Sequence, residues 1–359
     1  MDWTALRAEF PVLARRAYLN AGTDGPLPAR AAQAAADELA REAAEGRAMA
    51  HFVRRFELAD RLRARYAQAL GCDPADVALT SCTSEGIAQV IGGLALEPGD
   101  EILTSDEEHP GMLGALAAAR ELSGVSVRAV PLARIADGAG PRTRLIACCH
   151  VGWMSGTLAP AELAGLEVPV LLDGAQGVGA IAVDVQAIGC DAYAGAGQKW
   201  LCGPDGTGML YVSPALRERL RVGRRGYVNL LDPGAGLDAQ LHPDARRFDS
   251  PALSAEALAC AVAAVEVLAD AGWPAVHERA RALAAQLAQR LAEHGREVGP
   301  RDDTTLVAFT SEDPPAERER LVQAGCIVRD IPGRPWLRAS VGAWNDESDL
   351  ERLLAALSA

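Results

Sequence analysis

Short apolar segments alternate with amphipathic helical segments through the first two thirds of the chain. Segments with the length and apolar character of strands cover residues 77–80, 101–104, 125–130, 145–149, 168–172, 192–194 and 208–212. Helical segments fall between most of them, among them residues 84–94, which Ser84 is expected to cap, and 112–122. A long charged helical stretch at residues 29–66 is interrupted near Gly46. Strands that alternate with helices predict an α/β fold built on a mostly parallel seven-stranded sheet.

The pattern changes near residue 250. Helices rich in Ala, Leu and Arg are expected at residues 255–271 and 274–294. Short strands are expected after them at residues 305–309 and 326–329, and a closing helix at residues 347–358. This arrangement predicts a second, smaller α+β domain. We therefore expect three parts: an N-terminal segment that packs with the small domain (residues 1–18), a large domain (19–250) and the small C-terminal domain (251–359).

The composition excludes several kinds of partner. The formal net charge is -13 at pH 7, whereas a protein that binds nucleic acid needs a basic face to neutralise phosphates. No apolar run reaches the roughly 18 residues of a membrane-spanning helix, and the first residues lack the features of a secretory signal. The eight cysteines include no C-x-x-C pair, so neither a zinc site nor a disulfide framework is indicated. We expect a cytoplasmic protein without a metal, a nucleic-acid partner or a membrane partner.

The distribution of basic residues singles out Lys199. It is the single lysine among 35 lysine and arginine residues, and it lies in a glycine-rich turn between two expected strands. Arginine cannot attack a carbonyl as an amine, because its guanidinium stays protonated. A lone lysine among so many arginines therefore indicates amine chemistry, and a surface lysine spared by chance stays the alternative. The turn lacks the Ser or Thr of a P-loop and the third glycine of a dinucleotide-binding turn, which disfavours a nucleotide site.

Further polar residues follow other expected strands. Asp173 ends an apolar strand, where open α/β sheets bind their ligands, and it suits either a protonated pyridine nitrogen or a helix cap. Thr83 and Ser84 lie near a helix start, whose free N–H groups suit a phosphate. His109 suits either a helix cap or stacking on a planar cofactor. Together with Lys199, these residues predict a site for pyridoxal phosphate (PLP).

With these motifs in this order, the sequence resembles the class V aminotransferase family of fold-type I PLP enzymes, which includes cysteine desulfurases and cystine or cysteine C–S lyases. The resemblance runs from Tyr18 to Ser340. It implies that Lys199 forms a Schiff base with PLP and that Asp173 faces the pyridine nitrogen. It further implies that Gln176 donates to the ring hydroxyl of PLP and that the imidazole of His109 stacks on the ring. The implied phosphate ligands are Thr83, Ser84 and Gln198.

The resemblance also implies how a substrate is held. Arg338 matches the arginine that binds the substrate carboxylate, so that the substrate is a small α-amino acid. Desulfurases usually carry His where this chain has Gln198, although an amide N–H can replace an imidazole N–H. Members of this family form homodimers, which is the expected state of this protein.

The stretch before Arg338 separates two branches of the family. Cysteine desulfurases carry a cysteine on a mobile loop there, whereas residues 328–338 contain none, and two prolines and a glycine indicate a tight turn. Cys326 lies on the preceding strand, where we expect it to be packed. C–S lyases of the family resemble this chain around the lysine and in two arginines nine positions apart. The resemblance implies that Arg329 and Trp153 contact the substrate, and core filling stays the alternative for Trp153.

The resemblance thus implies a PLP-dependent C–S β-lyase that acts on cysteine, cystine or an S-substituted cysteine, with Lys199, His109 and Asp173 as catalytic residues. Removal of the Cα proton and loss of sulfur from Cβ would give aminoacrylate, then pyruvate, plus a thiol or persulfide. The same residues could serve an isopenicillin-N-epimerase-like epimerase or racemase, a class V aminotransferase or a cysteine desulfurase. A PLP-binding protein without activity is expected to lack Lys199 or Arg338, and both are present.

Overall fold

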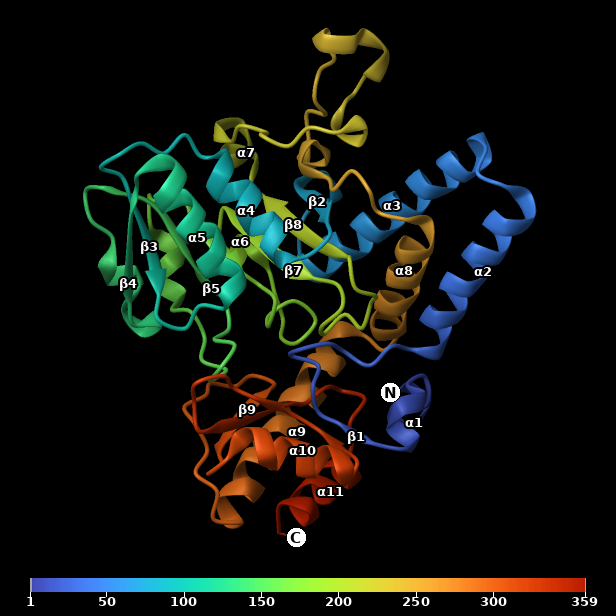
Figure 1. Ribbon diagram of the computed structural model, residues 1–359, viewed down its shortest axis with the longest axis vertical. Helices are drawn as coiled ribbons and strands as arrows, with labels where there is room; N and C mark the ends of the chain where they lie inside the picture. The colour runs from blue at the N-terminus through green and yellow to red at the C-terminus, as the bar shows by residue number, and fades with distance from the viewer. Residues whose placement is uncertain (1, 359) are drawn as a thin grey trace.

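The computed structural model describes residues 2–358 and has a large unit, built on a seven-stranded sheet, above a smaller unit in the view of Figure 1. The strands of the main sheet are β2 (Val77–Thr80), β3 (Glu101–Ser105), β4 (Ser126–Val130), β5 (Thr143–Cys149), β6 (Val170–Asp173), β7 (Ala192–Ala196) and β8 (Gly208–Val212). Their order is β2-β8-β7-β6-β5-β3-β4. β8 is antiparallel to β2 and β7, whereas the other neighbours are parallel. The predicted α/β fold and its seven strands are confirmed.

Both faces of the main sheet are covered, which explains why its strands are almost continuously apolar. Consecutive residues of a strand point to opposite faces. Leu171 lies in a cluster with apolar side chains of α4 (Thr83–Gly93) and α5 (Pro110–Ser123), whereas Leu172 lies in another cluster with Tyr66. A strand buried on both faces loses the alternation of apolar and polar residues.

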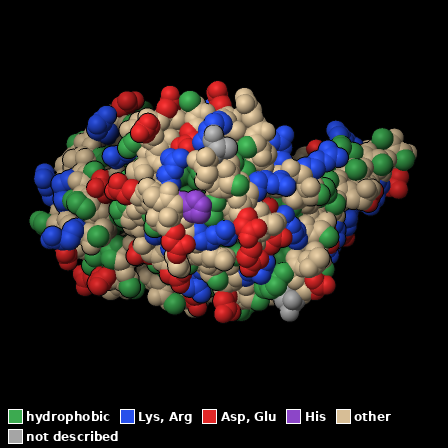
Figure 2. All heavy atoms as spheres, turned by 90° about the horizontal axis from the view of Figure 1, so that it is seen from below, with side chains coloured by type: hydrophobic (Ala, Val, Ile, Leu, Met, Phe, Trp, Pro, Cys, Tyr) green, Lys and Arg blue, Asp and Glu red, His purple; other side chains and the backbone are tan. Residues whose placement is uncertain are grey.

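Helices α2 (Ala29–Glu45), α3 (Met49–Leu70) and α8 (Ala255–Asp270) pack together beside the sheet. Gly46 ends α2 with a φ of 76°, a conformation that favours glycine. The predicted interruption near Gly46 is therefore confirmed. The hairpin of α2 and α3 projects at the right of Figures 1 and 2, and hydrophobic side chains show on its surface in Figure 2.

The smaller unit combines short strands with helices. Its elements are β1 (Ala17–Tyr18), α9 (Trp273–Glu293), β9 (Leu306–Thr310), α10 (Pro314–Gln323), β10 (Cys326–Ile327), β11 (Arg329–Asp330), β12 (Trp336–Ser340) and α11 (Glu347–Ser358). β11, β12 and β9 form an antiparallel sheet in this order, and β1 pairs with β10. The single strand predicted at residues 326–329 is wrong, because β10 and β11 pair with different partners. α10 was not predicted, since Leu321 alone among its residues is buried.

Residues 2–18 contact the smaller unit. Arg7 of α1 (Trp3–Ala8) bonds to Asp349 of α11 at 2.6 Å and pairs with Asp346 at 3.1 Å. β1 adds a parallel pairing with β10. Beyond residue 250, α8 still packs on α2 and α3, and α9 follows it into the smaller unit. The domain bounds at residues 18 and 250 stay predictions.

Short helices occupy many of the connecting loops. They are α6 (Val185–Ile188), α7 (Pro214–Arg219) and the 3-10 helices η1 (Pro11–Ala14), η2 (Pro74–Asp76), η3 (Leu132–Arg134), η4 (Ala136–Gly138), η5 (Ala161–Gly165), η6 (Tyr227–Asn229), η7 (Pro233–Asp238) and η8 (Ala245–Phe248). Within residues 2–358, no helix combines the length and apolar character needed to cross a membrane. The same residues hold no group of three or more His, Cys, Asp or Glu side chains arranged to bind a metal ion.

Candidate active site

A cavity of about 230 Å³ lies at the carboxyl ends of β2, β6 and β7. Parallel strands bring their carboxyl ends to one edge of a sheet, so that residues far apart in sequence converge there. Every site residue predicted from the sequence lines this cavity: Thr83, Ser84, His109, Trp153, Asp173, Gln176, Gln198, Lys199, Arg329 and Arg338. The cavity therefore joins side chains of the large unit to two arginines of the smaller unit. The individual roles of these residues stay predictions.

Lys199 and Asp173 bring opposite charges to the cavity. Lys199 opens onto the cavity and is otherwise enclosed by protein, and this burial lowers the pKa of its amine to about 8, although the Asp173 carboxylate opposes the shift. Asp173 is 6% exposed, and its burial raises the pKa of its carboxyl, which Lys199 in turn lowers. An amine with a lowered pKa is available as a nucleophile and a base near neutral pH.

Asp173 does not cap a helix. It ends β6, and its Oδ1 accepts a hydrogen bond of 2.9 Å from the N–H of Ala175 in the turn that follows. Since no helix begins there in the described chain, the cap alternative for Asp173 is wrong. Asp173 lines the cavity, so its carboxylate can pair with a cation bound there.

The amide of Gln176 is held from two sides. Its Nε2 donates to the carbonyl of Gly22 at 2.7 Å, and the indole N–H of Trp200 donates to its Oε1 at 3.0 Å. Gln176 and Trp200 are both buried. The amide therefore has one fixed orientation beside the cavity.

The N-terminus of α4 faces the cavity. Cys82 is the N-cap of this helix and makes no side-chain cap hydrogen bond, so the prediction that Ser84 caps the helix is wrong. The buried Thr83 Oγ1 and the Gln198 Oε1 have no hydrogen-bond partner among the described residues. Free N–H groups at a helix start, together with the Thr83 hydroxyl, suit an anion such as phosphate, whereas the Gln198 Oε1 can only accept a hydrogen bond.

His109 and Trp153 form another wall of the cavity. Their rings meet edge to face, with centroids 5.2 Å apart. His109 is also the N-cap of α5, since its Nδ1 accepts from the Gly111 N–H at 3.1 Å, so its capping and its place in the site coexist. Burial and the charge of Lys199 lower the pKa of His109 to about 4, which leaves the ring neutral at pH 7. A neutral, fixed ring can stack on a planar group, which stays the predicted role of His109.

Arg329 and Arg338 are opposite each other in the β11–β12 pair. Arg338 is 1% exposed and donates to the Trp153 carbonyl at 2.5 Å and to the Thr23 hydroxyl at 3.4 Å. Arg329 donates to the same hydroxyl at 3.3 Å. Burial and the charge of Arg329 lower the pKa of Arg338 to about 9. Within the described residues neither arginine has a carboxylate partner, so the pair suits an anionic group of a ligand.

Sequence reasoning missed four polar or glycine residues of the cavity lining: Gly22, Thr23, Asp24 and Cys82. The first three lie on a loop that crosses the site, where the Gly25 N–H donates to the Gln198 carbonyl at 2.7 Å. A Cβ at Gly25 would collide with the carbonyl of Lys199. Glycines at positions 22 and 25 are the signal that could have revealed this loop, because a Cβ at Gly22 would crowd side chains of the site and a Cβ at Gly25 would crowd a backbone.

Comparison with known proteins shows which proteins this chain resembles. Residues 17–353 match the protein family described as aminotransferase class-V. Isopenicillin N epimerase of Streptomyces clavuligerus is 29% identical, covering 100% of this chain and 98% of that protein. A probable cysteine desulfurase of Pseudomonas aeruginosa is 32% identical and aligns with 79% of this chain and 78% of its own length.

Solved structures agree with these matches. The cystine C–S lyase C-DES, in complex with its reaction product cysteine persulfide, is 27% identical with a TM-score of 0.91, covering 97% of this chain and 99% of that chain. A C-DES mutant with glycine covalently linked to its PLP cofactor is 27% identical with a TM-score of 0.92, covering 98% of each chain.

Proposed function

The chain belongs to the aminotransferase class-V family of PLP-dependent enzymes, and from this premise we propose that it is a C–S β-lyase. Its substrate would be cysteine, cystine or an S-substituted cysteine. Its products would be pyruvate, ammonia and the sulfur leaving group, which is hydrogen sulfide from cysteine, a persulfide from cystine and a thiol from an S-substituted cysteine. PLP, when bound, supplies a sink for the electron pair left at Cα after a proton is removed. The similarity to C-DES, a cystine C–S lyase, supports this branch of the family.

The residues of the cavity fit PLP. The unpartnered Thr83 Oγ1 and the start of α4 provide donors for its phosphate, with Gln198 beside them. Asp173 provides the negative charge that keeps a pyridine nitrogen protonated. Lys199 provides the amine that bonds the cofactor, and Gln176 offers an N–H at the same cavity.

The arginine pair would orient the substrate. The Nε of Arg338 is buried without a partner among the described residues, so a substrate carboxylate can accept from it. Arg329 adds a second positive charge, since it donates to the same Thr23 hydroxyl as Arg338. Holding the carboxylate at one end fixes Cα within reach of Lys199, whose amine has a pKa of about 8 and can take up the Cα proton.

The positions of the cysteines favour a lyase over a desulfurase. A desulfurase transfers sulfur to a cysteine beside the substrate, but the turn from β11 to β12 contains no cysteine. Cys326 is fully buried on β10, and burial raises the pKa of its thiol. Among the described residues Cys82 is the cysteine that lines the cavity, and it lies with Thr83 at the start of α4, at the proposed phosphate end.

Product analysis tests this choice. Incubation with cystine, cysteine and S-substituted cysteines should yield pyruvate from at least one of them, without an added thiol acceptor. Cys82→Ala and Cys326→Ala should keep pyruvate as the product. Alanine as the main product, abolished by either replacement, would show a desulfurase.

An epimerase is the second candidate. The isopenicillin N epimerase of Streptomyces clavuligerus aligns with the entire chain, which favours this alternative over a transaminase. An epimerase needs removal and return of the Cα proton but no leaving group on Cβ. The two candidates therefore differ in the fate of the Cβ–S bond.

We also propose that the enzyme is a cytoplasmic homodimer. All eight cysteines are free, as expected in a reducing compartment. Large apolar side chains are exposed on the α2–α3 hairpin and the nearby loop, including Met49, Phe52, Phe56 and Tyr227. The Phe52 and Tyr227 rings lie 6.3 Å apart, so these side chains form a contiguous apolar surface of the kind that binds a protein partner. Sedimentation equilibrium should give twice the mass of one chain.

A further inference from the structure

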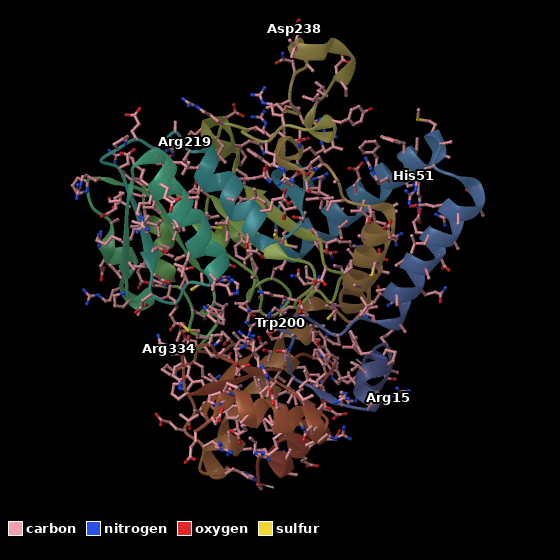
Figure 3. All side chains as sticks on the ribbon, in the orientation of Figure 1. Arg15, His51, Trp200, Arg219, Asp238 and Arg334 are labelled. Carbon is pink, nitrogen blue, oxygen red and sulfur yellow. The ribbon has the colours of Figure 1, made fainter. Side chains whose placement is uncertain are left out.

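Trp200, which follows Lys199 in the chain, makes a hydrogen bond that constrains the cavity without lining it. Trp200 is 1% exposed, and Figure 3 places it at the junction of the two units. Its Nε1 donates to the Oε1 of Gln176 at 3.0 Å. An indole N–H can donate but never accept, so this bond requires the oxygen of the Gln176 amide to face Trp200.

The opposite contact of Gln176 leads to the same orientation. Its Nε2 donates at 2.7 Å to the carbonyl oxygen of Gly22, which can only accept. An amide nitrogen carries two hydrogens, and Gly22 takes one of them. The second N–H has no partner within residues 2–358, and Gln176 lines the cavity. The pair of bonds therefore presents a donor, and not an acceptor, to a ligand.

We propose that Trp200 is a positioning residue that holds the Gln176 amide with its N–H directed at the ring hydroxyl oxygen of PLP. This proposal rests on the proposed role of Gln176 in cofactor binding. Without the indole N–H, the Gly22 carbonyl alone would hold the amide, and rotation, which would place the amide oxygen against the negatively charged oxygen of the cofactor, would cost one hydrogen bond instead of two. A donor at this oxygen stabilises its ionised form, and an acceptor destabilises it.

The test compares Trp200→Phe with Trp344→Phe. Trp344 is an apt control because it is 2% exposed and its Nε1 has no hydrogen-bond partner among the described residues. Both replacements remove a similar volume from the interior, but Trp200→Phe alone removes a hydrogen bond. Equilibrium binding of PLP to the cofactor-free protein should weaken about tenfold in Trp200→Phe. The pH midpoint of the visible band of bound PLP should rise in Trp200→Phe, and Trp344→Phe should change neither quantity.

A double-mutant cycle shows whether Trp200 acts through Gln176. Adding Trp200→Phe to Gln176→Leu should produce no further change in PLP affinity or in the pH midpoint. Independent, additive effects would overturn the proposal, and so would a Trp200→Phe protein indistinguishable from the unchanged enzyme. If Gln176→Leu itself changes neither quantity, the role of Gln176 fails and the proposal fails with it, whereas product analysis of the lyase reaction is unaffected.

A second replacement tests the proposal in case Trp200→Phe does not fold. A benzothiophene analogue of the Trp200 side chain keeps its volume and replaces the N–H by sulfur. It should weaken PLP binding and raise the pH midpoint as Trp200→Phe does, while the cofactor-free protein unfolds at the temperature of the unchanged protein. Unchanged PLP binding with this analogue would refute the positioning role.

Discussion

The amine of Lys199 becomes neutral at a lower pH than an exposed lysine, because burial lowers its pKa to about 8 from the ordinary value of 10.5. Only the neutral amine attacks the aldehyde of PLP. The rate at which cofactor-free enzyme captures PLP should therefore rise with pH through a midpoint near 8 and level off above it. Stopped-flow absorbance measures this rate. A rate that keeps rising to pH 10 would mean that Lys199 titrates as an exposed lysine.

We expect Asp173 to contribute charge and not shape. Asp173→Asn keeps an oxygen for the Ala175 N–H but removes the negative charge from the proposed cofactor site. Turnover should fall roughly a thousandfold, because stabilisation of charge at the reacting centre is a large catalytic contribution. PLP content, measured by absorbance, should stay near that of the unchanged enzyme.

The same variant links Asp173 to Lys199. The Asp173 carboxylate raises the pKa of the Lys199 amine, so its loss should move the midpoint of PLP capture below 8. Normal turnover in Asp173→Asn would reduce Asp173 to a turn-forming residue.

Individual site residues differ in how far the sequence revealed them. Lys199, Asp173 and His109 follow or precede apolar strands, and strand ends of one sheet must converge, so their meeting could be predicted. Thr23 could not, because its bonds to Arg329 and Arg338 span more than 300 positions and its loop has no periodic pattern. Trp200 follows Lys199 in the glycine-rich turn that the sequence singled out. Its hydrogen bond to Gln176 could not be predicted, because it depends on the packing of two turns.

At the level of elements, the β11–β12 pair places two like charges directly opposite each other. Such a pair destabilises the sheet unless an anion binds between or beside the charges. Arg329→Leu should therefore raise the melting temperature of the enzyme while it lowers kcat/KM about a hundredfold, chiefly through KM. Calorimetry measures the melting temperature and steady-state kinetics measures KM and kcat on the same preparation. A lower melting temperature together with unchanged KM would show that Arg329 serves the fold alone.

The main sheet and the smaller unit were not equally predictable. The strands of the main sheet are buried on both faces, so their apolar runs identify them. The chain from Cys326 to Asp330 also has the composition of one strand, but β10 adds to β1 from the N-terminal segment and β11 adds to β12. Pairing with a segment about 300 residues away leaves no local signal, so this change of partner required the structure.

In the whole molecule, the N-terminal segment contacts the smaller unit, which carries both arginines proposed to bind the substrate. Arg7 bonds to Asp349, whose side chain is 4% exposed, so Arg7→Leu would leave a buried carboxylate without its partner. The free energy of unfolding should fall by about 3 kcal/mol. KM should rise while PLP content stays unchanged, because Arg329 and Arg338 lie on β11 and β12 of the smaller unit. Denaturant titration and kinetics provide the two measurements.

Arg134→Leu is the matched control for Arg7→Leu. Arg134 pairs with Asp137 at 3.2 Å on the surface, where both side chains are largely exposed. Its loss should cost less than about 1 kcal/mol. Equal effects of the two replacements would show that the N-terminal segment does not hold the smaller unit.

The fate of the Cβ–S bond tests the proposed lyase most directly. In deuterated water with an S-substituted L-cysteine, each removal of the Cα proton ends either in loss of sulfur or in return of a deuteron. Mass spectrometry of pyruvate and of recovered substrate, with chiral separation, counts both outcomes. We predict that pyruvate accounts for nearly all the consumed substrate and that no D-enantiomer accumulates. Recovered substrate that carries deuterium at Cα and is partly inverted, without pyruvate, would contradict the lyase and establish an epimerase.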